Sequence, residues 1–118
     1  MRYQMRAHPE IVVDAFQLTA ARRCDKSTWI SWMHVAWNTP IDARGSLYPA
    51  RPGVADGPLM LNTAYGPMRV EFGDYLTCEA DGSVHVHAPL QFEATYKAVE
   101  GDPETHHAQG FYQSTRGS

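Results

Sequence analysis

The sequence predicts an α+β fold: an antiparallel, strongly twisted sheet or partly open small β-barrel of about five strands, with one α-helix packed on it. Three observations lead to this prediction. Eight prolines and nine glycines divide the 118-residue chain into short segments, which favours strands and turns over long helices. Residues 59–88 contain short β-type runs separated by turn signals. Residues 26–38 carry apolar side chains at helical spacing.

Length and composition bound the organisation of the chain. A chain of 118 residues is the usual size of one domain. With 43% hydrophobic and 19% charged residues, it has the composition of a packed domain rather than that of a disordered chain. We therefore place a single β-rich domain at 1–100 and a polar C-terminal tail at 101–118.

The first predicted elements are a strand and a helix. Residues 11–18 are rich in β-branched side chains, which predicts a strand buried on at least one face. Asp25 can cap the start of a helix over 26–38, and Pro40 stops that helix. Its predicted apolar face consists of Trp29, Met33, Ala36 and Trp37.

The second half of the chain predicts a meander of about four strands. It follows a long loop at 39–58, a segment rich in proline and glycine. The predicted strands lie at 59–62, 68–72, 75–79 and 83–87. Asp81-Gly82 is a strong signal for the turn between the last two. A short helical turn at 90–95 and a closing strand at 96–99 complete the prediction.

Charge is distributed unevenly along the chain. Residues 1–51 carry seven Lys or Arg and four acidic residues, whereas residues 52–118 carry three basic and nine acidic residues. Such asymmetry is typical of complementary faces in a homo-oligomer or of an acidic surface for a basic partner; mixing of both signs in the fold is the simpler interpretation. The longest basic cluster is Arg22-Arg23, which argues against nucleic acid as a partner.

The sequence predicts a cytoplasmic protein with no membrane segment. Its opening residues lack the apolar core of a signal peptide, and no run approaches the roughly 20 apolar residues that cross a bilayer. Cys24 and Cys78 are therefore expected to be free thiols.

His85 and His87 are the candidate metal ligands. Two histidines at i and i+2 on a strand share a face, so both imidazoles could bind one ion. Further ligands would have to come from Cys78, across the hairpin, or from His106 and His107. Because no complete ligand set appears at a telling spacing, two half-exposed strand histidines are the favoured interpretation, and no cofactor is predicted.

The search for catalytic motifs finds none, so no catalytic residue is predicted. The chain has neither a Gly-x-Ser-x-Gly elbow nor a phosphate-binding glycine loop, and paired carboxylates such as Glu79 and Asp81 fall at turns. Aromatic side chains are enriched at protein interfaces, whereas a stripe at helical spacing usually packs in the core. The candidate contact residues are Trp32, Tyr48, Tyr65 and Tyr75.

Two segments resemble a group of small proteins encoded by tailed phages and prophages. In the first, Pro9 leads into residues 12–17 (VVDAFQ), similar to a Val-rich strand that ends in Asp/Glu-Ala-Phe-Gln. The second contains residues 66–70 (GPMRV), 73–75 (GDY) and 89–96 (PLQFEATY), similar to the group's Gly-x-Met-x-Val, Gly-Asp-aromatic and Pro-x-x-Phe-Glu-x-Thr-Tyr succession.

The resemblance implies a phage origin and a compact domain. The group carries no settled activity, so no site residue is transferred from it. It usually has a Tyr-Pro-Cys-like run where this chain has His85-Val86-His87, so the resemblance gives no support to a metal there.

Together these features predict a phage accessory protein of the host cytoplasm that binds a host protein, such as a defence protein, and inhibits or modulates it. A virion decoration or assembly protein would also be small and β-rich. A small metal-dependent enzyme that uses His85 and His87 is the third alternative.

Overall fold

The secondary structure consists of short strands and short helices. The structure is a computed structural model, and the description covers residues 1–99; the predicted tail at 101–118, with His106 and His107, lies outside the described residues. The strands are β1 (Arg2–Met5), β2 (Val12–Gln17), β3 (Leu47–Pro49), β4 (Leu59–Thr63), β5 (Gly66–Val70), β6 (Tyr75–Cys78), β7 (Val84–His87) and β8 (Tyr96–Ala98). The helices are α1 (Ala20–Cys24), the 3-10 helix η1 (Lys26–Thr28), α2 (Ser31–Trp37) and α3 (Pro89–Thr95).

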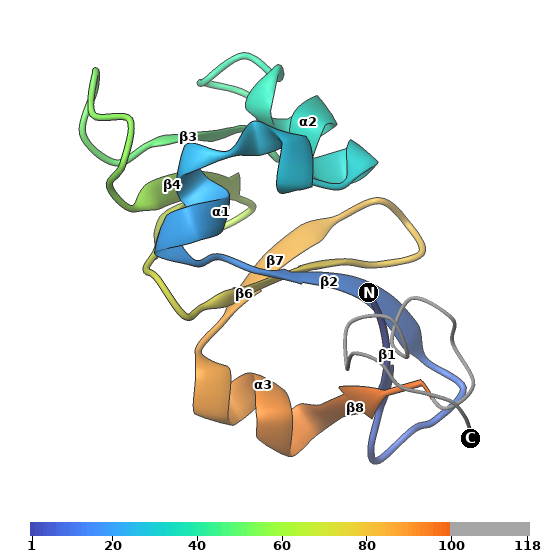
Figure 1. Cartoon of the computed structure of the whole chain (residues 1–118). Coiled ribbons are helices and arrows are strands. Elements are labelled where there is room, and N and C mark those ends of the chain that lie inside the picture. Colours follow the sequence, from blue (N-terminus) through green and yellow to red (C-terminus); the bar gives the residue numbers. More distant parts are fainter. Residues whose placement is uncertain (100–118) are drawn as a thin grey trace.

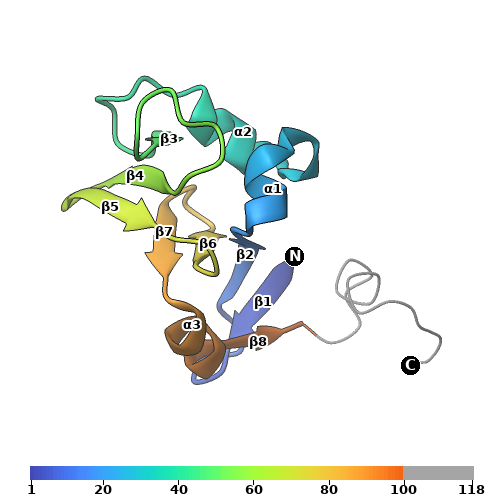
Figure 2. The same ribbon diagram turned by 60° about the vertical axis from the view of Figure 1, so that its left-hand side comes forward.

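Over residues 1–99 the strands form two antiparallel sheets. The larger sheet has five strands in the order β7-β6-β2-β1-β8, and the smaller sheet has three in the order β3-β4-β5. The small sheet, α1 and α2 lie at one end of the molecule and α3 at the other, with the large sheet between them (Figure 1). Figure 2 shows the same separation from a second direction. The predicted α+β class and antiparallel sheet are confirmed.

Strand β2 occupies the centre of the large sheet, between β1 and β6. Successive side chains of a strand point to opposite faces. Val13 and Ala15 are therefore buried on one face, and Phe16 and the following Leu18 are buried on the other. Burial on both faces explains the nearly continuous apolar run in this segment, and it gives the molecule two apolar cores.

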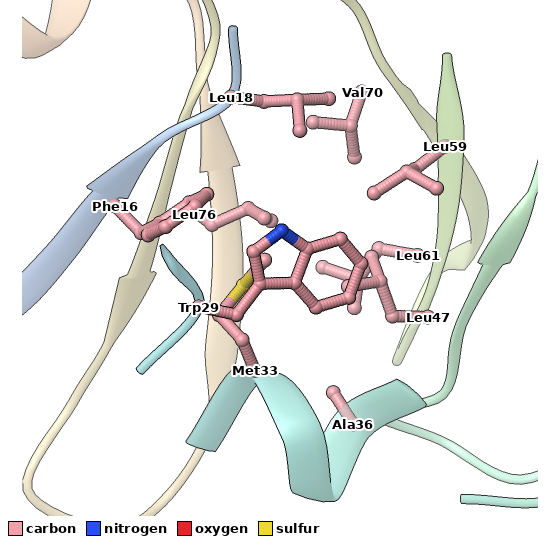
Figure 3. Packing of buried hydrophobic residues seen from close by; sticks show 10 residues of the cluster. All are labelled: Phe16, Leu18, Trp29, Met33, Ala36, Leu47, Leu59, Leu61, Val70 and Leu76. Atoms are coloured by element: carbon pink, nitrogen blue, oxygen red, sulfur yellow. The ribbon is translucent and has the colours of Figure 1, made fainter. Parts of the chain in front are cut away.

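The first core lies between the two sheets and α2 (Figure 3). Trp29 lies in the middle of this core, and its indole N–H donates to the Arg22 carbonyl at 2.7 Å, so its one polar atom is satisfied. The buried members are Phe16, Leu18, Trp29, Met33, Ala36, Leu47, Leu59, Leu61, Val70 and Leu76. The predicted apolar face of the 26–38 segment is confirmed at Trp29, Met33 and Ala36, which are buried in this core, while Trp37 is partly buried against it.

The second core lies between α3 and the other face of the large sheet. Phe92 is only 1% exposed, and its ring stacks on Tyr75 with centroids 4.0 Å apart and on Tyr96 with centroids 5.0 Å apart. Val13 and Ala15 of β2 complete this core. After α3 the chain enters β8, which pairs with β1 at the edge of the sheet.

The predicted helix at 26–38 is wrong in its extent. The segment divides into η1 and α2, because Trp29 and Ile30 between them have extended backbones. Asp25 does cap a helix, but only the single turn of η1, where it accepts from the Ser27 N–H at 3.0 Å. Of the three α-helices in residues 1–99, α3 confirms the predicted helical turn at 90–95, whereas α1 was not predicted. None of the helices in this range is long and apolar enough to cross a bilayer.

The predicted loop at 39–58 contains strand β3. Leu47 pairs with Leu61 of β4 and is 2% exposed, so part of this segment belongs to the first core. Pro49 ends the strand at a free edge, where a missing N–H breaks no ladder hydrogen bond. The proline-rich composition therefore concealed a short edge strand.

The predicted four-strand meander is two hairpins in different sheets. Strands β4 and β5 pair with each other in the small sheet, whereas β6 pairs with β2 through Leu76 and Phe16. Gly73, with φ at 98°, lies at the turn between the hairpins, and its N–H donates to the Leu18 carbonyl at 2.7 Å. Strand β1 was not predicted, and the two sheets do not close into a barrel.

Phe92→Ala is expected to lower the free energy of unfolding by about 3–5 kcal/mol, because the cavity would open between packed aromatic rings and β2. Leu90→Ala is the matched control on the same helix: Leu90 is 82% exposed, and its truncation should change stability by about 0.5 kcal/mol or less. Urea unfolding followed by circular dichroism measures both values. Equal losses would contradict the burial of Phe92 between α3 and the large sheet.

Candidate functional site

A hollow of about 660 Å³ lies between the tips of the β4–β5 and β6–β7 hairpins. We call it the hairpin cleft. Its volume falls within the range of ligand-binding pockets in proteins. The side chains that give it chemical character are those of Arg44, Tyr65, Glu79, Asp81, Ser83 and His85.

The β4–β5 turn presents Tyr65 to solvent. The Thr63 hydroxyl accepts from the Tyr65 N–H at 3.1 Å and donates to the Gly66 carbonyl at 2.7 Å, so one side chain holds the turn from both sides. Gly66 has φ at 108°, a conformation that L side chains rarely adopt. Tyr65 is consequently 99% exposed at the rim of the cleft.

The segment that carries Arg44 is fastened to β4 by its backbone. The Gly45 N–H donates to the Asn62 carbonyl at 2.8 Å, and the Asn62 N–H donates to the Ser46 carbonyl at 2.9 Å. The Asn62 side-chain amide also donates to the Ala43 carbonyl at 3.3 Å. These bonds fix Arg44 in the wall of the cleft, and no carboxylate within residues 1–99 forms an ion pair with its guanidinium.

The β6–β7 turn supplies the negative charges. Asp81 Oδ1 accepts from the Ser83 N–H at 2.9 Å and from the Ser83 hydroxyl at 2.6 Å. Gly82 between them has φ at 87°, as the Asp-Gly turn signal requires. The side-chain hydrogen bond from Ser83, followed by its backbone hydrogen bond, lowers the pKa of Asp81. Asp81 is therefore ionised at neutral pH, and the cleft contains charges of both signs.

Ser83, His85 and Glu79 have the residue types of a hydrolytic triad but not its geometry. In a triad the serine approaches one ring nitrogen of the histidine and the carboxylate holds the other. Here the Ser83 hydroxyl, at 3.1 Å, and the Glu79 carboxylate, at 3.3 Å, both approach Nε2 of His85. The Ser83 hydroxyl also donates to Asp81. This network stabilises the turn and positions charge, and it does not activate Ser83 as a nucleophile.

The two candidate metal ligands are directed to different partners. His85 contacts Glu79, while Nε2 of His87 lies 3.0 Å from the Thr77 hydroxyl. Cys78 pairs with Val84 and so lies on the opposite face of the strand from His85; the prediction of Cys78 as a third ligand is wrong. Across residues 1–99, no three His, Cys, Asp or Glu side chains are grouped so that they could hold a metal ion.

The His87 ring packs against the second core, between α3 and the large sheet. Its ring centroid lies 6.0 Å from that of Phe92 and 5.8 Å from that of Tyr96. Burial, with a smaller contribution from the neighbouring His85, lowers the pKa of His87 because the core favours the neutral ring. The sequence could not separate this histidine from His85, since both occupy the same face of β7.

The four aromatic contact candidates are spread over the molecule. The Trp32 indole N–H donates to Asp14 at 3.0 Å beside the first core, and Tyr75 stacks on Phe92 in the second. The Tyr48 hydroxyl lies 3.4 Å from the Asn62 side chain on the small sheet. Of the four, Tyr65 lines the cleft. Arg44 was missed as a candidate because its loop carries no motif.

Comparison with models of protein families, with curated proteins and with solved structures finds no match to this chain. The functional interpretation therefore depends on the chemistry of its own side chains.

The free energy of unfolding is expected to fall as the pH drops from 7 to 5. The pKa of His87 is lower in the folded than in the unfolded chain, so the unfolded state binds more protons at pH values between the two pKa values. The contribution of His87 to the free energy of unfolding is therefore fully present above the unfolded pKa of about 6.5 and declines below it. One such proton gives a slope of at most about 1.4 kcal/mol per pH unit.

His87→Gln should flatten this dependence, since the glutamine amide can still reach Thr77 but does not titrate. Leu90→Ala, at an exposed residue that carries no titratable group, provides the control and should leave the slope as in the wild type. Urea unfolding at a series of pH values measures the slopes. Identical slopes in wild type and His87→Gln would contradict the role of His87.

Proposed function

We propose that this chain is a phage-encoded accessory protein that binds a host protein through the hairpin cleft and modulates its activity. The observation that carries the proposal is the complete exposure of Tyr65 beside a hollow lined by charges of both signs. The phage origin rests on the sequence resemblance at residues 1–17 and 66–99.

An exposed tyrosine on a fixed turn is well suited to binding. Tyrosine offers a large apolar ring with a polar end, and it loses only two side-chain rotations on contact, which explains its enrichment at interface hot spots. Thr63 already holds the turn, so little backbone freedom remains to be lost when a partner covers Tyr65.

The charges of the cleft favour a protein partner over an apolar small molecule. Arg44 can receive an acidic group, and Glu79 with Asp81 can receive a basic one. Opposed charges around an aromatic contact orient the partner and speed its association more than they add affinity. A surface of a folded protein presents such alternating charge, so the proposed partner is a protein with a basic side chain beside an acidic one.

Tyr65→Ala is expected to weaken partner binding at least about 30-fold, corresponding to a hot-spot loss of about 2 kcal/mol or more. The partner would be identified by cross-linking the full-length wild-type protein in host lysate, and affinities would then be measured with the purified partner by calorimetry. Because Tyr65 is fully exposed, circular dichroism and thermal stability should be unchanged.

Leu90→Ala, at an exposed apolar residue of α3 outside the cleft, should bind the partner like the wild type. A partner that binds wild type and Tyr65→Ala equally would place the interface elsewhere and contradict the proposal. Recovery of the chain within purified phage particles, in place of a complex with a host protein, would favour a virion component.

A further inference from the structure

A second hollow, of about 310 Å³, lies where α1 and η1 meet the end of α2 and the segment after β3. We call it the Arg23 hollow. Its lining includes Arg23, Cys24, Lys26, Trp37, Pro49 and Val54. Among residues 1–99, no acidic residue lines it. It shares no lining residue with the hairpin cleft.

Arg23 is a buried cation without a buried anion. It is 3% exposed, and its guanidinium donates to the Gly57 carbonyl at 2.9 Å and to the Val54 carbonyl at 3.0 Å. These bonds fasten the segment after β3 to α1. Within residues 1–99 no carboxylate forms an ion pair with Arg23, although a buried charge normally has such a partner.

Lys26 brings a second cation to the same place. Its ammonium lies 4.5 Å from the centroid of the Trp37 ring, and the Arg23 guanidinium carbon lies 5.6 Å from that centroid. Each cation is attracted by the ring, but the two repel one another. The nearest acid in the sequence, Asp25, is outside the lining and accepts two hydrogen bonds from Ser27.

The Trp37 indole also has a spare donor. Trp29 donates its N–H to a backbone carbonyl and Trp32 donates to Asp14, whereas the Trp37 N–H has no acceptor among the side chains and backbone of residues 1–99. A partly buried indole N–H usually finds an acceptor. Two cations and the indole ring of Trp37 therefore line a hollow to which, among residues 1–99, no acidic side chain contributes.

We propose that the Arg23 hollow binds a small anionic ligand that combines a phosphate or carboxylate group with a flat apolar portion. The anionic group pairs with Lys26 and Arg23 and relieves the repulsion between them. The apolar portion packs on the apolar wall of Pro49 and Val54, beside Trp37. A volume of about 310 Å³ lies at the small end of ligand pockets and suits one ring with one charged group.

A purely structural role accounts for Arg23 but not for Lys26. Arg23 fastens the 53–57 segment through two carbonyls whether or not a ligand is present. Lys26 is exposed, and among residues 1–99 its ammonium contacts only the Trp37 ring. Replacement of Lys26 therefore tests the site without releasing that segment, whereas an Arg23 variant could lose the local fold.

The test is titration of the full-length protein with phenyl phosphate, benzoate, inorganic phosphate and benzyl alcohol at constant ionic strength, followed by the NMR signal of the Trp37 indole N–H. Saturable one-to-one binding of phenyl phosphate or benzoate is expected, and whichever binds more tightly identifies the anionic group. Inorganic phosphate lacks the ring and should bind more weakly; benzyl alcohol lacks the charge and should not shift the signal.

Lys26→Gln is expected to weaken binding of the organic anion at least tenfold, while Lys97→Gln, which removes an exposed lysine on β8, should leave it unchanged. Binding of neither organic anion, equal binding by wild type and Lys26→Gln, or equal binding of benzyl alcohol would each overturn the proposal. Binding of a glutamate-rich peptide without binding of either small anion would also overturn it, in favour of an acidic protein partner.

Discussion

The structure depends on one constraint, which is that β2 buries both of its faces. A shift of this strand by one residue would exchange its two faces and place Val13, Ala15 and Phe16 each in the wrong core, so its register is strongly specified. Asp14 is the one charged residue of the strand, and its carboxylate accepts the Trp32 indole N–H. The two cores and the helices over them are arranged around this strand.

The hairpin cleft is a consequence of how the hairpins are distributed between sheets. Strand β6 pairs with β2 in the large sheet, whereas β4 pairs with β3 in the small sheet. The two hairpins are consecutive in the chain, yet their tips belong to different sheets and enclose a hollow between them. Residues at such tips can vary in chemistry without disturbing the cores, which is why loops on a rigid scaffold often carry function.

The two hollows differ in charge and in construction. The hairpin cleft combines Arg44 with two carboxylates and an exposed tyrosine, which suits the varied surface of a protein. The Arg23 hollow has two cations around one indole and, within the described part of the chain, no acidic residue in its lining, which suits a compact anion. One small domain thus offers two separate surfaces with different chemical preferences.

The sequence by itself determined the features that depend on neighbouring residues. The Asp81-Gly82 turn, the strand pairs around it and the helical face of Met33 and Ala36 were predicted, because turn chemistry and side-chain alternation operate over a few residues. The break before α2 and the strand at Leu47 were not predicted, since both depend on contacts with distant parts of the chain.

Only the tertiary structure decided which side chains became available for function. Tyr65 and Tyr75 were equivalent candidates in the sequence, but Tyr75 is covered by Phe92 whereas Tyr65, on the turn held by Thr63, is 99% exposed. In the sequence Arg23 is one of two adjacent arginines with no special signal, whereas in the fold its guanidinium is buried and donates to two carbonyls of the 53–57 segment. Burial and charge pairing are set by residues far apart in the sequence, so the sites emerged from packing and not from local pattern.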